Sequence, residues 1–274
     1  MITQADEIHA LTETLIDELI KAFALPKTRL TDKFIRLTFG NAASATAKVG
    51  IGLDCAVAEG GLPAGARWLL PRFVKSHSAC GVENIPARGP LVIASNHPAS
   101  IDSIVISAHV NRPDYKIIIG DIPFFEHLPH VRQNAIFAPD QNNIAGRMQV
   151  MRESIRHLRS GGALLIFPRG SIEPDPAFMP HPEAEFDHWS RSLEIFMQRI
   201  PGLQILITIA SGEVGVCQID VACFKYSSDF GKPYACTYFG ALHKRGRLRE
   251  TVFSFFGIDY FWRTHTNRKS HQLF

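Results

Sequence analysis

Past residue 80 the sequence alternates short apolar runs rich in β-branched residues with stretches of helical periodicity. Runs of about four to eight such residues are typical of buried strands, and strands that alternate with helices form a mostly parallel sheet. The sequence therefore predicts an α/β fold, with a mostly parallel sheet flanked by helices. Strands are expected at 91–95, 115–119, 134–138, 163–167 and 203–210, and helices at 101–110, 143–159 and 183–199.

Before residue 60 the apolar residues recur at helical spacing instead. One such pattern runs up to Pro26, and shorter ones follow at 30–39 and 42–58. The stretch GGLPAG at 60–65 interrupts them. We therefore predict an N-terminal helical segment over 1–62 and an α/β domain over 63–274. The C-terminal tail of this domain is basic and aromatic.

The composition is that of an ordinary globular protein. The chain has 274 residues, of which 46% are hydrophobic and 20% charged, with a net charge of +3. These values exclude a disordered, collagen-like or coiled-coil chain, and so small a charge does not indicate nucleic-acid binding. No apolar run approaches the roughly 18 residues of a membrane-spanning helix, and the start lacks a signal-peptide pattern. We therefore expect a cytoplasmic protein without a nucleic-acid partner.

The first loop of chemical interest is NHPASID (96–102), which directly follows the run LVIAS. It places His97 at the exit of a strand, and Ser100 is expected to cap the next helix. A carboxylate at Asp102 can hold the Nδ1–H of His97 and leave Nε2 as an outward-facing base. A structural loop histidine is the alternative, because the same spacing recurs in His109 and Asp114. No strand precedes that second copy, which favours the first.

The second loop is FPRGS (167–171), at the end of the run ALLIF. Proline and glycine around an arginine predict a turn whose backbone N–H groups point into a pocket, which suits an anion or an oxyanion. A plain turn with a solvated arginine is the alternative. The candidate substrate-binding residues are Phe167, Pro168, Arg169, Gly170 and Ser171.

Together these loops resemble the glycerolipid acyltransferases, whose best-known members are the lysophosphatidic acid acyltransferases. GVENIPARGPLVIASNHPASID (81–102) and GGALLIFPRGS (161–171) are similar to that family's Asn-His-x4-Asp and Phe-Pro-Glu-Gly-Thr blocks, in order and distance, and the similarity extends over about 78–240. The resemblance implies that His97 is the general base, that Asp102 orients it, and that the second loop binds substrate. It also implies transfer of a fatty acyl group from an acyl-CoA or acyl-carrier-protein thioester to a hydroxyl of a lipid-like acceptor.

The residues suit this chemistry. An alcohol has a pKa far above neutrality, so its attack on a thioester needs a positioned base such as His97, with N–H donors for the oxyanion. The thioester is already activated, so no nucleophilic serine or cysteine is needed. No metal and no cofactor beyond the thioester co-substrate are expected, because the sequence has no P-loop or G-x-G-x-x-G, its five cysteines form no CxxC pair, and His127 and His130 lack a third ligand at recognisable spacing.

The charges in these blocks depart from those of the resembled family. Arg169 stands where glutamate is usual, and Asp140 and Ile172 stand where arginines contact the acceptor phosphate. Arg169 and Glu173 are candidates for a displaced phosphate contact and a displaced carboxylate. We expect phosphate monoesters to be poor acceptors compared with a neutral or zwitterionic hydroxyl lipid. A catalytically silent protein that binds acyl lipids or acyl thioesters is the alternative function.

Cations and aromatic rings gather in two segments, at 67–75 with Trp68, Phe73 and Lys75, and in the tail over 244–263. Such mixtures suit a membrane interface, although rings in the core and cations in solvent are the alternative. We therefore expect peripheral membrane contact, beside an acyl thioester donor and a lipid-like acceptor as partners. The acidic first helix is expected to pack on the core or to form a lid.

Overall fold

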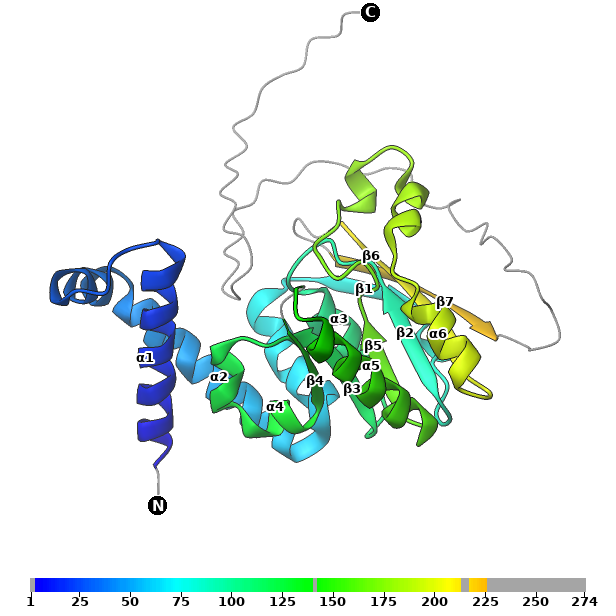
Figure 1. The fold of residues 1–274 in the computed structure, drawn as a ribbon, viewed down its shortest axis with the longest axis horizontal. Coiled ribbons are helices and arrows are strands. Elements are labelled where there is room, and N and C mark those ends of the chain that lie inside the picture. The colour runs from blue at the N-terminus through cyan, green and yellow to red at the C-terminus, as the bar shows by residue number, and fades with distance from the viewer. Residues whose placement is uncertain (1–2, 140–141, 213–216, 226–274) are drawn as a thin grey trace, which may run out of the picture.

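The structure, a computed structural model, describes residues 3–139, 142–212 and 217–225. For the last of these ranges, it describes the backbone. A helical hairpin at the N-terminus stands beside a domain built on one sheet (Figure 1). The α-helices are α1 Gln4–Ala22, α2 Arg29–Phe73, α3 Asp102–His109, α4 Pro129–Gln133, α5 Ile144–Arg159 and α6 Ser192–Arg199, and the 3-10 helices are η1 Val82–Asn84, η2 Pro123–His127, η3 Pro176–Phe178 and η4 Pro182–His188. The strands are β1 His77–Cys80, β2 Leu91–Ser95, β3 Tyr115–Gly120, β4 Ala135–Ala138, β5 Ala163–Ile166, β6 Gln204–Ser211 and β7 Cys217–Lys225.

The seven strands form one sheet in the order β1-β7-β6-β2-β5-β3-β4. Neighbouring strands are parallel except for the antiparallel pair β6 and β7. The predicted fold class is therefore confirmed. All five predicted strands are present within a residue at each end, whereas β1 and β7 were not predicted. Strand β1 is short and mostly exposed, so it has no apolar run to reveal it.

Strand residues alternate between two buried faces of this sheet. Leu91 and Ile93 of β2 join a core with Val105 of α3, and α2 contributes to the same cluster. Val92 of β2 faces the other way, into a core with Phe196 of α6. Because helices cover both faces, the loops at the carboxyl ends of the strands are where a substrate can reach the domain.

Helix α2 is continuous over the range where two helical patterns were expected, and its helical geometry is interrupted where GGLPAG was expected to interrupt it. Its backbone leaves helical geometry at Gly60 and Gly61, and Gly61 has a φ of 71°. The two halves then pack closely: a Cβ at Gly65 would lie 2.4 Å from Val57 Cγ2. Only glycine permits that approach. The division of the chain into 1–62 and 63–274 stays a prediction.

Two local predictions were wrong. Residues 183–199 do not form one helix, because the segment runs as 3-10 helix from Pro182 to His188 before α6 begins at Ser192. The N-cap position of α3 is Ile101 rather than Ser100. The carboxylate of Asp102, in the first turn of α3, instead accepts a hydrogen bond from the backbone N–H of Ala99 at 3.0 Å.

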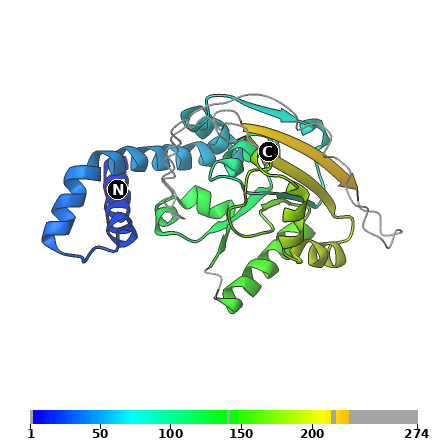
Figure 2. The ribbon, with the colours of Figure 1, turned by 90° about the horizontal axis from the view of Figure 1, so that it is seen from above.

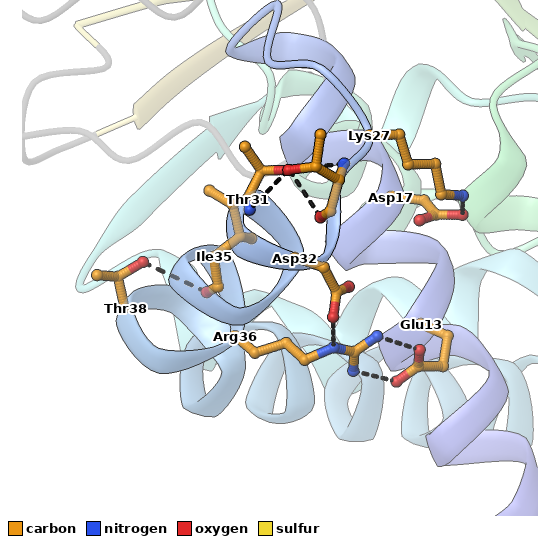
Figure 3. Close-up of polar contacts among 9 residues, drawn as sticks. Glu13, Asp17, Lys27, Thr31, Asp32, Ile35, Arg36 and Thr38 are labelled. Atoms are coloured by element: carbon orange, nitrogen blue, oxygen red, sulfur yellow. Dashed lines mark hydrogen bonds and ion pairs between the residues drawn. The ribbon is translucent and has the colours of Figure 1, made fainter.

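The N-terminal hairpin of α1 and the start of α2 projects from the sheet domain (Figure 2). Its inner face is apolar, and an exposed ion pair between Arg36 and Glu13 joins the two helices. Figure 3 shows Arg36 bound through both terminal nitrogens to Glu13, at 2.6 Å each, and through Nε to Asp32 at 2.8 Å. Lys27 bonds Asp17 at 2.8 Å. These contacts fix the hairpin as a unit.

Two histidines connect the hairpin and α2 to the sheet domain. His127 Nε2 lies 2.8 Å from the Thr14 hydroxyl, and His130 Nδ1 lies 2.7 Å from Asp54 Oδ2. The other oxygen of Asp54 accepts the Val131 N–H at 2.8 Å. The two histidines thus have separate partners. Among the described residues, no helix combines the length and the apolar character needed to cross a bilayer.

Candidate active site

His97 lies in the loop between β2 and α3, at the carboxyl end of the sheet. Its Nδ1 is 2.8 Å from Asp102 Oδ2, in the first turn of α3. The Asp102 carboxylate is fully buried, whereas 23% of the His97 side chain remains exposed. The pair therefore has the arrangement of an oriented base, with a buried carboxylate behind a ring that a substrate can reach.

Burial also shifts the pKa of the Asp102 carboxyl. It raises the pKa of Asp102 to about 6, against the hydrogen bond and charge of His97 and the N–H of Ala99. The second oxygen, Oδ1, is buried without a hydrogen-bond partner. The contact with this carboxylate occupies Nδ1, which leaves Nε2 as the ring nitrogen that can take up a proton.

The second loop lies against the first. The Phe167 ring stacks on the His97 ring with centroids 4.1 Å apart and planes 19° apart. Pro168 is buried, and its carbonyl accepts the Ser190 N–H at 3.0 Å. Gly170 has a φ of 73° and donates its N–H to the Phe167 carbonyl, so this N–H serves the turn itself. Gly170 and Ser171 are exposed.

Arg169 has a partner that the sequence did not reveal. It forms an ion pair with Glu185, in η4, and both side chains are largely covered. Ile172 is exposed. Asp140, the other position where the resembled family has an arginine, lies outside the described residues, as does the tail over 244–263.

Several buried or half-buried polar residues around the His97 loop were given no role or only a tentative one from the sequence. The Asn96 amide bonds both backbone groups of Ala210, at 2.9 and 2.7 Å, and so anchors the loop to β6. Glu173 donates its backbone N–H to the His97 carbonyl at 2.9 Å. Asp175 accepts the N–H of Gly212 at 3.1 Å, and burial raises the pKa of both acids. The acidic stretch IEPDP after the second loop was the available signal.

The second copy of the His-x4-Asp spacing makes no such pair. Asp114 binds Arg112 at 2.6 and 2.9 Å, and the His109 ring packs near His77, with centroids 5.2 Å apart. Of the two copies, the one that follows a strand forms a His–Asp contact and the other does not, as the sequence context indicated.

Comparison with known proteins agrees with this geometry. Residues 78–188 match a family model described as Acyltransferase, and the match spans both loops. This segment is similar to acyltransferase domains. The match agrees with the predicted family and enzyme class, and it ends at residue 188, short of the expected 240.

The solved structures that are similar to the chain include that of the 1-acyl-sn-glycerophosphate (LPA) acyltransferase PlsC from Thermotoga maritima. The TM-score is 0.43 and the identity 15%, over 82% of this chain and 86% of that chain. No curated protein sequence matches the chain.

Proposed function

We propose that the acyltransferase domain moves a fatty acyl group from an acyl-CoA or acyl-carrier-protein thioester to a hydroxyl of a lipid-like acceptor. The observation that carries this proposal is the 2.8 Å contact between His97 and the buried Asp102. Nε2 of His97 removes the hydroxyl proton while the oxygen attacks the thioester carbonyl carbon. The C–S bond then breaks, and the leaving thiolate takes the proton from the imidazolium that Asp102 stabilises.

The second loop supports this assignment through its contact with the base. Phe167 covers one face of the imidazole and limits the rotation of that ring. The exposed backbone at Gly170 and Ser171 is then the part of the loop that meets substrate. No cofactor beyond the thioester co-substrate has a role in this scheme.

Release of free thiol tests the reaction. Wild-type protein incubated with acyl-CoA, or with acyl carrier protein, should release thiol at a rate that depends on an added hydroxyl lipid. A comparison of the two carriers identifies the donor. Binding of the acyl thioester without thiol release would instead favour the alternative, a catalytically silent acyl-thioester binding protein.

The acceptor in this proposal is a neutral or zwitterionic lipid rather than a phosphate monoester. Arg169 is already paired with Glu185, and Glu173 and Asp175 place further carboxylates near the base. Charge-assisted contacts to a phosphate contribute about 1.5–3 kcal/mol each, and this loop shows no second arginine to supply them. The measurement is kcat/KM across acceptors of each class. A preference for lysophosphatidic acid that disappears in Arg169→Ala would contradict the proposal.

We also infer that the protein touches anionic membranes through the outer face of its helical hairpin. Leu30, Phe34 and Leu37 of α2 follow one another at helical spacing with side chains 81%, 57% and 85% exposed. The same turns carry the cations Arg29 and Lys33, which suits anionic headgroups. This surface is distinct from the segment at 67–75 that the sequence favoured.

The predicted segment at 67–75 is partly occupied by internal contacts. A Cβ at Gly52 would lie 2.5 Å from the Trp68 ring, and the Arg72 guanidinium lies 3.5 Å above that ring. Phe73 remains exposed. Replacing Leu30, Phe34 and Leu37 by glutamine should therefore reduce co-sedimentation with anionic vesicles more than Phe73→Gln does. Failure of the wild-type protein to bind such vesicles at low salt would contradict the inference.

A further inference from the structure

A small cavity lies beside the loop that carries the proposed base. Its lining includes two carboxylates, two aromatic rings and one amide, from Glu173, Glu185, Phe186, Trp189 and Asn96. The remaining lining residues are prolines and an isoleucine of β6. Apolar walls with a few convergent polar groups are the usual composition of a ligand site.

The Glu173 carboxylate is the polar group of this cavity that most clearly lacks a partner. Only 4% of the residue is exposed, and its Oε1 has no hydrogen-bond partner among the described residues. The Trp189 N–H approaches this carboxyl without completing a hydrogen bond. A buried carboxylate oxygen without a donor destabilises the fold, so a donor that enters the cavity restores a missing contact.

The charges around the cavity call for a cation. Arg169 forms an ion pair with Glu185, so these two charges neutralise each other. No ion pair among the described residues includes Glu173, which leaves one negative charge at the cavity without a partner. An anion would add to this charge, whereas a small cation would compensate it.

The aromatic walls favour an ammonium group as that cation. The Phe186 and Trp189 rings meet edge to face, with centroids 4.7 Å apart, and ammonium groups are attracted to the faces of such rings. A primary ammonium also has N–H donors for Glu173 Oε1, whereas a quaternary ammonium has none. Among the described residues, no cluster of three acids, histidines or cysteines offers a metal ion a site.

Hydrogen bonds attach the cavity to both active-site loops. The backbone N–H of Glu173 donates to the His97 carbonyl at 2.9 Å. The N–H of Ser190, next to Trp189, donates to the Pro168 carbonyl at 3.0 Å. A group bound in the cavity is therefore held against the loops that carry the base, as part of one site.

We propose that this cavity binds the primary ammonium group of the acceptor lipid, with Glu173 Oε1 as its hydrogen-bond acceptor and the Phe186 and Trp189 rings as its walls. The inference rests on the proposed function. It narrows the acceptor to a zwitterionic lipid that carries both a free hydroxyl and a primary amine. The ammonium fixes one end of the headgroup, and the hydroxyl is the part that reaches His97.

The test compares three acceptors that share one acyl chain. Lysophosphatidylethanolamine has a primary ammonium, lysophosphatidylcholine a quaternary one, and monoacylglycerol none. Thiol release from one acyl donor gives kcat/KM for each. We expect the wild type to prefer lysophosphatidylethanolamine to the other two by about tenfold, the factor that a charge-assisted hydrogen bond of roughly 1.4 kcal/mol supplies.

The variant that probes the cavity is Glu173→Gln, which keeps the shape of the side chain and removes its charge. It should abolish most of the preference for lysophosphatidylethanolamine. The matched control is Glu183→Gln, because Glu183 is an exposed acid in the same segment between β5 and α6. This control should retain the preference of the wild type.

Binding without turnover is measured by calorimetric titration with sn-glycero-3-phosphoethanolamine, against sn-glycero-3-phosphocholine. Equal use of the three acceptors by the wild type overturns the proposal, and so does a preference that persists in Glu173→Gln. If the glutamine variant does not fold, the acceptor preference of the wild type decides. Absence of thiol release with every acceptor would refute the proposed function. In that case the calorimetric titration decides the proposal, and equal or absent heats with the two headgroups overturn it.

Discussion

The helical hairpin and the active-site loops use charged side chains in opposite settings. In the hairpin, Arg36 and Glu13 are 42% and 39% exposed, and both terminal nitrogens of the arginine meet a carboxylate oxygen. At the active site, Asp102 and Glu173 are buried, and each has an oxygen without a hydrogen-bond partner. In the hairpin the charged groups are paired and partly exposed to water. At the active site the carboxylates are buried, and burial disfavours their charged form.

This difference separates the charges that hold the fold together from those that perform chemistry. Exposed ion pairs contribute about 0–1 kcal/mol each, because water and salt screen them. Buried carboxylates destabilise the folded state, but they can hold a catalytic base in one orientation. Substitutions in the two regions should therefore affect different measurements, stability in one and turnover in the other.

The largest expected effect comes from removing the base while leaving a second His–Asp pair intact. His97→Ala should lower acyl transfer by about 100-fold or more, with little change in stability, because general-base catalysis contributes roughly 10²–10⁴ in rate. His130→Ala is the matched control, since His130 and Asp54 form a similar contact of 2.7 Å far from the active-site loops. Equal losses in both variants would show that the contact with Asp102 is structural.

A smaller effect is expected in the pH dependence of stability. Burial raises the pKa of Asp102 from 3.8 to about 6, so between these values the folded state holds more protons than the unfolded state. The free energy of unfolding therefore falls as pH rises through this window, by about 3 kcal/mol at pH 7. Asp102→Asn should remove most of this fall and be more stable than wild type at pH 7, although less active. Urea denaturation at several pH values measures it.

The control for this pH dependence is Asp114, where the sign is reversed. Arg112 lowers the pKa of Asp114, so the charged carboxylate stabilises the fold above its unfolded pKa and this stability is lost as pH falls. Asp114→Asn should therefore lower stability at pH 7. An Asp102→Asn protein that is also less stable at pH 7 would mean that the buried carboxylate contributes to folding after all.

The smallest effect is expected in the hairpin. Arg36→Ala should lower the free energy of unfolding by about 1 kcal/mol or less, and added salt should reduce even that difference. Activity on soluble substrates should not change. Arg191→Ala, which removes an exposed pair with Glu194 in the sheet domain, is the comparison. A loss of several kcal/mol in Arg36→Ala would show that the hairpin depends on its charges as the active site does.

Sequence reasoning succeeded where the signal is local. The central strands are short apolar runs, and the loops that follow β2 and β5 place His97 and Phe167 side by side because these strands are neighbours. The partner of Arg169 could not be predicted, because Glu185 lies 16 residues away in a segment whose prolines and acids favour no regular element. Strand β7 was missed although its sequence alternates polar and apolar residues over 218–221, which is the period of a strand.

Asn96 continues the sheet after its strand has ended. Its side-chain amide donates to the carbonyl of Ala210 and accepts from the N–H of the same residue, as the peptide group of a neighbouring strand would. The main chain at this point is thereby released from pairing and is able to turn and present His97. A side chain that imitates a peptide group should leave the Ala210 amide hydrogen as slow to exchange with solvent as those inside β6, even though β2 stops at Ser95. His97 thus follows directly after the last residue that is hydrogen-bonded to the sheet, because the Asn96 side chain extends the hydrogen bonding of β2 by one residue.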